Sequence, residues 1–222
     1  MNATATFSGI EIVASIQRLV RARCSTGLLF AVSLALCAAE VVAADAPQMR
    51  DVVLIIDNSA SMKANDSTSL TKQALLEFTK DIPQNTRISM IIYDHEIQLA
   101  MPLTVWGEGG AEEFPKALTN INYRGKLTKT ADALERALYE ISKNGRKGAE
   151  FSVVLLTDGQ IDSGDKLRDR EGVKWIRGAL TDEAASTSVK VYGIAFTDKA
   201  DVITLQSLAR RTSATYLRAF QA

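Results

Sequence analysis

The sequence predicts an α/β fold: a doubly wound, mostly parallel six-stranded sheet with one antiparallel edge strand and helices on both faces. Strand-like and helix-like segments alternate along the chain, which is the order that builds a parallel sheet covered by helices. Two strand-like runs, at 52–56 and 153–156, are aliphatic throughout. Uninterrupted apolar runs of this length are typical of strands buried on both faces of a sheet.

The first half of the chain supplies a helix and two further strands. Residues 70–81 repeat apolar side chains at helical spacing, and Pro83 ends that helix. Residues 87–93 are predicted to form the second strand. The third strand, over 96–103, follows the tight turn at Asp94-His95, so we expect it to be antiparallel and to lie at an edge of the sheet.

The second half continues the same alternation. The remaining elements expected are helices near 111–121 and 130–144, one helix around 173–180 in an otherwise loop-rich and charged segment over 165–187, a strand over 189–196, a helix over 202–211 and a last short strand over 215–220. This order, together with the two aliphatic strands, completes the predicted six-stranded sheet.

The composition fits one folded domain and argues against some partners. A chain of 222 residues with 46% hydrophobic content is enough for one well-buried core. The 26 basic and 26 acidic residues balance, so nothing drives the chain generally toward nucleic acid or an anionic membrane. Both cysteines, Cys24 and Cys37, precede residue 47, which leaves the rest without a disulfide or a Cys-based zinc site.

The amino terminus is expected to be a separate segment, residues 1–46, ahead of a domain over 50–220. Its basic residues are Arg18, Arg21 and Arg23. An apolar stretch and then small residues follow, which is the pattern of a secretory signal peptide cleaved after Ala44. The alternative is an uncleaved membrane anchor through 27–44, although the apolar run is short for a span and Glu40 interrupts it. We therefore expect the protein to be exported, to the periplasm or as a secreted protein, with membrane anchoring as the alternative.

Two short polar strings directly follow the two aliphatic strands. One is Asp57-Asn58-Ser59-Ala60-Ser61 and the other is Thr157-Asp158-Gly159. Strands of a parallel sheet end at one common edge, so we expect these strings to meet there. In an extended segment alternate residues point the same way, which would place Asp57, Ser59 and Ser61 on one side.

Hydroxyl and carboxylate oxygens are ligands that Mg²⁺ accepts. With neutral hydroxyls as ligands and only two aspartates nearby, the ion would stay under-neutralised and attract an anionic ligand, most simply a carboxylate from a partner. The alternative interpretation is structural. In that case Ser59 and Ser61 only cap the next helix, and Asp158-Gly159 is only a turn.

A third string, over 125–134, opens a helix between the two strands. Together the three strings resemble the von Willebrand factor type A domain, whose metal-ion-dependent adhesion site has the pattern Asp-x-Ser-x-Ser, a Thr in a Gly-Gly-Thr-x-Thr-like loop, and an Asp in a Thr-Asp-Gly turn. The resemblance implies a Rossmann-like fold and the metal ligands Asp57, Ser59, Ser61, Thr128 and Asp158. In that family the hydroxyls bind the metal directly, whereas the Asp residues often act through water.

The sequence departs from the family pattern without removing a ligand. Ala60 and Ala131 stand where glycine is common, and Lys126-Leu127 replaces the glycine pair, which makes the loop of Thr128 stiffer. Thr130 is the competing choice for the threonine ligand, but it better suits the start of the helix.

The resemblance implies a non-enzymatic, metal-dependent protein-binding module of the small exported bacterial type. A bound Mg²⁺ or Mn²⁺ would capture an acidic residue of a partner protein. Basic side chains surround Thr128, and they either form a solvated face or favour acidic partners; they are Arg124, Lys126 and Lys129. One alternative is an accessory subunit of an ATPase or chelatase-type complex. The other is a metal-dependent hydrolase, which has no candidate base beyond Asp57, Asp158 and Asp162.

Overall fold

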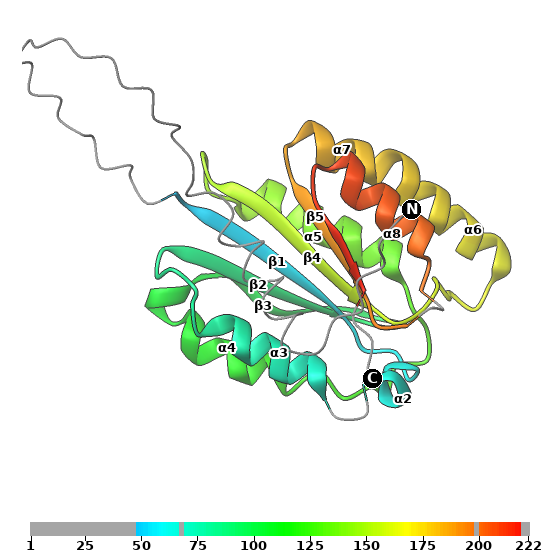
Figure 1. The fold of residues 1–222 in the computed structure, drawn as a ribbon, viewed down its shortest axis with the longest axis horizontal. Coiled ribbons are helices and arrows are strands. Elements are labelled where there is room, and N and C mark those ends of the chain that lie inside the picture. Colours follow the sequence, from blue (N-terminus) through cyan, green and yellow to red (C-terminus); the bar gives the residue numbers. More distant parts are fainter. Residues whose placement is uncertain (1–47, 67–68, 198–199, 219–222) are drawn as a thin grey trace, which may run out of the picture.

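The computed structural model describes residues 48–66, 69–197 and 200–218, so the predicted segment 1–46 lies outside the described residues. Six strands form one sheet in the order β3-β2-β1-β4-β5-β6 (Figure 1). The strands are β1 (Arg50–Asp57), β2 (Thr86–Tyr93), β3 (Ile97–Val105), β4 (Glu150–Thr157), β5 (Lys190–Ala195) and β6 (Tyr216–Arg218). Every pairing is parallel except that of β2 with β3. The predicted mostly parallel sheet with one antiparallel edge strand is confirmed.

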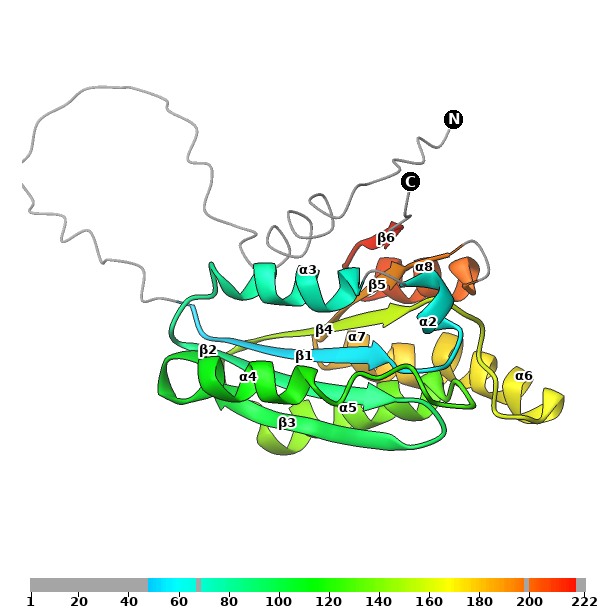
Figure 2. The same ribbon diagram turned by 90° about the horizontal axis from the view of Figure 1, so that it is seen from below.

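Helices cover both faces of the sheet (Figures 1 and 2). They are α2 (Met62–Asn65), α3 (Leu70–Thr79), α4 (Gly110–Leu118), α5 (Thr130–Asn144), α6 (Lys166–Trp175), α7 (Thr181–Ser186) and α8 (Val202–Arg211), with a 3-10 turn η1 (Trp106–Glu108) and a π-helical segment η2 (Ile176–Leu180). Alternate residues of β1 point into two separate cores. Leu54 packs with side chains of α3 and α4, whereas Ile55 packs with those of α5, α7 and α8. This burial on both faces explains the unbroken aliphatic run.

Strand β1 holds the centre of the sheet and fixes where the site forms. It pairs in parallel with β2 on one side and with β4 on the other, so that Ile56 lies opposite both Ile92 and Leu156. The three strands therefore end level with one another. Their carboxyl ends meet at the right-hand edge of the sheet in Figure 1. The loops that follow β1 and β4 consequently leave the sheet side by side.

The prediction for residues 165–187, mostly loop with one helix around 173–180, is wrong. It is almost wholly helical, because α6, η2 and α7 follow one another directly. Asp165 caps α6 by accepting hydrogen bonds from the backbone N–H groups of Leu167 and Arg168. Helix α6 buries none of its residues, so the sequence carries no apolar period to reveal it. Gly178 then has non-helical backbone angles, which break the regular pattern again.

Other boundaries shift by a few residues. The helix expected over 70–81 ends at Thr79, the one expected near 111–121 covers Gly110–Leu118, and α8 begins and ends as predicted. The short helix α2 was not expected. Within the described residues, no helix combines the length and the apolar character that a membrane span requires.

Candidate metal centre

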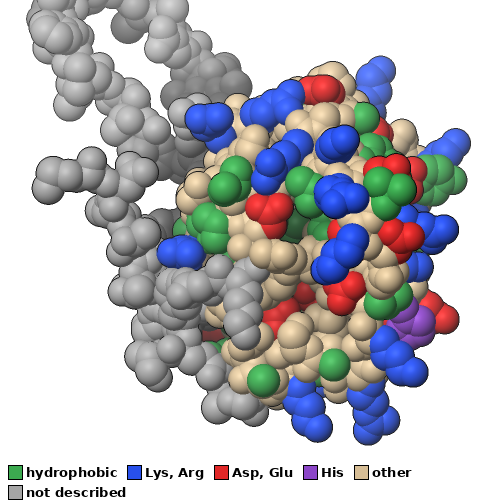
Figure 3. Space-filling view, turned by 90° about the vertical axis from the view of Figure 1, so that its right-hand side faces the viewer, with side chains coloured by type: hydrophobic (Ala, Val, Ile, Leu, Met, Phe, Trp, Pro, Cys, Tyr) green, Lys and Arg blue, Asp and Glu red, His purple; other side chains and the backbone are tan. Residues whose placement is uncertain are grey.

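Three loops converge where the parallel strands end. Asp57 is the last residue of β1 and Thr157 is the last residue of β4. The loop before α5 lies against the β1 loop through a parallel bridge between Ser59 and Gly125. Figure 3 looks onto this edge and shows acidic side chains near its middle with Lys and Arg side chains gathered around them. The strand order thus brings together strings that lie far apart in the sequence.

Hydrogen bonds connect the hydroxyl and carboxylate groups of the first and last strings. The hydroxyl oxygens of Ser59 and Ser61 are 3.1 Å apart. The Ser61 hydroxyl donates to Oδ1 of Asp158 at 3.0 Å. Asn65, at the end of α2, donates to the other oxygen of Asp158 at 2.7 Å. A continuous row of three oxygen-bearing side chains therefore spans the β1 and β4 loops.

Ser61 reaches this row by a different route from the one predicted. The extended alternation continues only as far as Ser59, because Ser61 already has helical backbone angles, φ −61° and ψ −34°. A turn closes after Ser59, whose carbonyl accepts from the N–H of Met62 at 3.1 Å. Ser61 is the N-cap residue of α2, but its hydroxyl makes no capping hydrogen bond and donates to Asp158 instead. The structural alternative, in which it only caps the helix, does not describe this hydroxyl.

Asp57 is fully buried and is held by neutral donors. The backbone N–H of Ser59 donates to its Oδ1 at 2.9 Å, and the Thr157 hydroxyl donates to its Oδ2 at 2.7 Å. The hydroxyl of Tyr93 lies 3.3 Å from the same Oδ2. Burial raises the pKa of Asp57 to about 6; the donors from Ser59 and Thr157 oppose this rise and the charge of Asp158 adds to it. In the metal-free state this carboxylate is therefore poorly compensated.

The two candidate threonines have different surroundings. Thr130 lies at the start of α5, and its hydroxyl is 3.3 Å from the hydroxyl of Tyr93 in the interior. The backbone of Thr128 pairs with Asp162, with its N–H donating to the Asp162 carbonyl at 2.7 Å. Within the described part of the chain, the Thr128 hydroxyl forms no hydrogen bond. The hydroxyl oxygen of Thr128 is thus free to bind a ligand where the loop before α5 meets the loop after β4. The hydroxyl of Thr130, in contrast, contacts Tyr93 in the interior.

Several residues of the site were missed at the level of sequence. Asn58 holds the loop before α5, because its Oδ1 accepts from the backbone N–H groups of Asn122 and Tyr123, each at 2.8 Å. Its amide donates to Asp94 at 3.1 Å. A side chain at Gly125 would collide with Asp94, since an added Cβ would lie 2.1 Å from that residue's Cβ. The only available signal was the position of Asn58 inside the first string.

The hydrogen-bonded row of oxygens has a spacing that also suits a small divalent cation. Ligands bound at about 2.1 Å in adjacent octahedral positions are separated by about 3 Å. The observed separations are 3.1 Å between the two serine hydroxyls and 3.0 Å between Ser61 and Asp158. No group of three or more His, Cys, Asp or Glu residues suited to a metal occurs in the part of the chain that the structure describes. A cation here would therefore depend on hydroxyl ligands, as the family pattern requires.

An open, mostly parallel sheet with helices on both faces defines a doubly wound α/β domain, a class in which ligand sites form at the carboxyl edge of the strands. A model of the von Willebrand factor type A domain family matches residues 51–221 of this chain. The chain therefore belongs to the von Willebrand factor type A family.

Relatives place the same domain within much longer proteins. The human collagen alpha-1(XXI) chain is 27% identical over 171 residues, which is 75% of this chain and 16% of that relative. Bovine integrin alpha-2 is 28% identical over 156 residues, which is 67% of this chain and 12% of that relative. The chain thus spans less than a fifth of the length of these relatives.

Solved structures show the same fold. The von Willebrand factor type A structure from Catenulispora acidiphila has a TM-score of 0.61 at 14% identity, covering 77% of this chain and 38% of that one. The conserved hypothetical protein BatB from Bacteroides thetaiotaomicron has a TM-score of 0.58 at 14% identity, covering 78% of this chain and 91% of that one.

Proposed function

We propose that this domain binds a protein partner through a divalent cation, Mg²⁺ or Mn²⁺. The residues that would hold the cation are Asp57, Ser59, Ser61, Thr128 and Asp158. When bound, the cation supplies an open coordination position for the carboxylate of an Asp or Glu of the partner. The surrounding loops then contact the rest of the partner surface.

Two features together support this proposal: three side-chain oxygens have a spacing that suits a cation, and no basic side chain of the described residues neutralises the two aspartates beside them. Ser61 lies within 3.1 Å of Ser59 and 3.0 Å of Asp158. Among the described residues, no Lys, Arg or His forms an ion pair with Asp57 or Asp158. Because the hydroxyl ligands are neutral, a divalent cation held here retains affinity for a further anion. The relatives support the protein-binding part, since integrins and collagens are adhesion proteins.

The test measures the cation and the partner separately. Isothermal titration of the purified protein with MgCl₂ and MnCl₂ should show one site, which Asp158→Ala removes and Asp132→Ala retains. Asp132 is an exposed carboxylate at the start of α5 and serves as the matched control. A pull-down from an envelope extract should then yield a partner that chelator releases. Absence of metal binding to the wild type would remove the proposed mechanism.

We also infer that the domain performs no chemistry of its own. Of the three candidate bases, Asp57 and Asp158 accept hydrogen bonds on both oxygens, and Asp162 accepts one on Oδ1 from the backbone N–H of Gly164 at 3.0 Å. Phosphoester hydrolysis assayed with Mn²⁺ should therefore stay at the background rate. Hydrolysis by the wild type that disappears in Asp158→Ala would favour a metal-dependent hydrolase instead.

We propose that binding takes place outside the cytoplasm, after cleavage of the amino-terminal segment as a signal peptide. Protein recovered from the native host should then begin near Asp45. Amino-terminal sequencing of the periplasmic and membrane fractions checks this. An intact Met1 in the membrane fraction would support anchoring through 27–44.

A further inference from the structure

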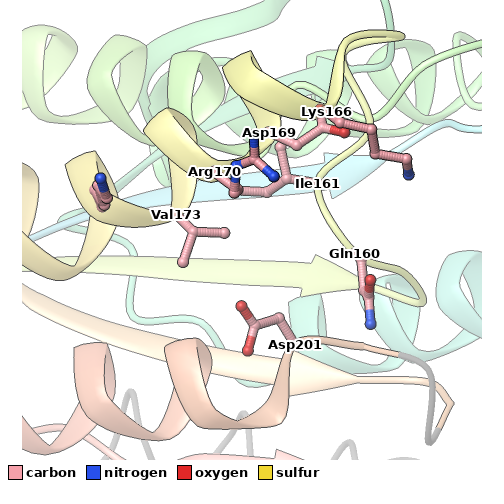
Figure 4. A pocket seen from close by; sticks show the side chains of 8 residues that line it. Gln160, Ile161, Lys166, Asp169, Arg170, Val173 and Asp201 are labelled. Atoms are coloured by element: carbon pink, nitrogen blue, oxygen red, sulfur yellow. The ribbon is translucent and has the colours of Figure 1, made fainter.

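A cavity of about 590 Å³ opens between α6 and α8, beside the loop that follows Asp158 (Figure 4). Its lining combines an apolar part with charged side chains; it consists of Gln160, Ile161, Lys166, Asp169, Arg170, Val173, Lys174 and Asp201. None of the residues assigned to the cation lines it. The cavity is thus a second feature of the same edge that the proposed function leaves unused.

The two acidic residues of the cavity form hydrogen bonds or ion pairs with other residues of the chain. Asp169 accepts from the backbone N–H and the hydroxyl of Ser163, both at 2.7 Å. Asp201 caps α8 by accepting from the N–H and hydroxyl of Thr204, at 3.0 and 2.5 Å, and it faces Arg177 at 3.4 Å. Arg177 therefore balances the charge of Asp201, whereas Asp169 has neutral hydrogen-bond donors and lies under the influence of the Lys166 charge.

Two of the basic residues have no such partner. Arg170 and Lys174 lie one turn apart on α6, and both are exposed. Across residues 48–66, 69–197 and 200–218, neither forms an ion pair within 4.0 Å. The cavity consequently presents the positive charge of Arg170 and Lys174 together with the apolar side chains of Ile161 and Val173 (Figure 4).

The cavity lies within a short reach of the proposed cation. Gln160, at its rim, follows Asp158 by two residues, and two residues of chain span at most about 7 Å. A partner segment with an acidic residue at the cation would pass this rim within a few residues. The two positions can therefore be occupied by one extended segment.

We infer that this cavity binds a second acidic side chain, a glutamate, from the same partner segment that places its first acidic residue at the cation. The glutamate's methylene groups would lie against Ile161 and Val173, and its carboxylate would face Arg170 and Lys174. This inference rests on the proposed function, and it specifies the partner as a segment with two acids a few residues apart. Opposite charges that meet at a partly enclosed site favour such a segment over a neutral one.

The experiment uses two synthetic Gly/Ser peptides, one with two Glu residues separated by three positions and one with the second Glu replaced by Gln. Both are titrated into the ¹⁵N-labelled protein with saturating MgCl₂ and again with chelator. The two-Glu peptide should bind about fivefold more tightly and move the resonances of Arg170, Val173 and Lys174. The double variant Arg170→Glu/Lys174→Glu should abolish that preference, whereas Arg168→Glu, an exposed residue of the same helix outside the cavity, should retain it.

The outcomes separate the two proposals. Peptides that bind equally with Mg²⁺ and move only the resonances near Ser59 and Ser61 would overturn the cavity inference and leave cation capture standing. Cavity resonances that move as strongly with chelator, without a response near Ser59, would show the cavity binding acids while the cation mechanism fails. Peptides that move neither set would overturn both.

Discussion

The two ends of strand β1 each bury an aspartate, and the two are compensated in opposite ways. Asp51, near the amino end, has a fully buried side chain held by Arg146. The Nε group of Arg146 donates to Oδ1 at 2.9 Å, its Nη2 forms an ion pair with the same oxygen at 2.7 Å, and its backbone N–H donates to Oδ2 at 2.8 Å. Asp57, at the carboxyl end, receives from the described residues only an N–H and hydroxyl groups.

The difference separates a carboxylate that has a basic partner from the one that we propose to hold the cation. A buried carboxylate needs positive charge or neutralisation by a proton, because the interior solvates the ion poorly. The fold supplies a guanidinium to Asp51 and leaves Asp57 with a pKa raised to about 6. A bound divalent cation would supply positive charge to Asp57, as Arg146 does to Asp51.

The largest expected effect on stability comes from removing the basic partner of Asp51. Arg146→Ala keeps the backbone N–H donor but leaves Arg87, at 3.8 Å, as the one basic side chain paired with buried Asp51 among the described residues. It should lower the free energy of unfolding by about 4 kcal/mol. Urea denaturation measures this, with Arg210→Ala as the control because Arg210 is exposed and forms no ion pair with any of the described residues. The metal affinity should not change. A loss below about 1 kcal/mol would mean that Asp51 is not stabilised by this pair.

The raised pKa of Asp57, which has no basic partner among the described residues, should make the free energy of unfolding depend on pH. Asp57 has a native pKa of about 6 against about 3.9 unfolded, so the folded state binds more protons between these values. Its contribution is complete below about pH 3.9 and is lost as the pH rises through 6, to a total of about 3 kcal/mol in the metal-free protein. Asp57→Asn should remove this component. Urea titrations of both proteins in chelator, from pH 4 to pH 7.5, should give curves that diverge; parallel curves would contradict the comparison.

Cation binding should restore stability at the carboxyl end alone. At pH 7.5, MgCl₂ at a hundred times its dissociation constant should stabilise the wild type by about 2.7 kcal/mol. Asp158→Ala should abolish the shift, while Asp132→Ala and Arg146→Ala keep it. Thermal melts over a series of metal concentrations measure this, and a shift that survives in Asp158→Ala would place the cation elsewhere.

The smallest effect distinguishes the two threonines. Thr128→Val removes the uncommitted hydroxyl at nearly constant volume and should reduce the metal-dependent stabilisation by about 1 kcal/mol, with Thr128→Ser retaining it. Thr130→Val loses the contact with Tyr93 and should instead cost about 1 kcal/mol in the absence of metal. Melts with Mg²⁺ and with chelator separate these effects. The reverse pattern would make Thr130 the ligand.

Much of the fold follows from local pattern. The aliphatic runs at 52–56 and 153–156 and the periodic helix α8 were predicted because burial leaves its period in the sequence. Helix α6 escaped prediction for the same reason, since it buries none of its residues. The strings that carry Asp57, Ser59 and Asp158 are predicted to meet because they follow two aliphatic runs, and parallel strands end at a common edge; the role of these residues as ligands is implied by the family resemblance.

The contacts within the site were decided by the tertiary structure. Asn65 bonds Asp158 across 93 positions, and Arg146 reaches Asp51 across 95. Neither pair leaves a local signal, because each depends on the order and register of β1 and β4 rather than on spacing along the chain. The sequence by itself determined which strands carry polar residues at their ends; the packing decided which of two buried aspartates on one strand received a positive partner.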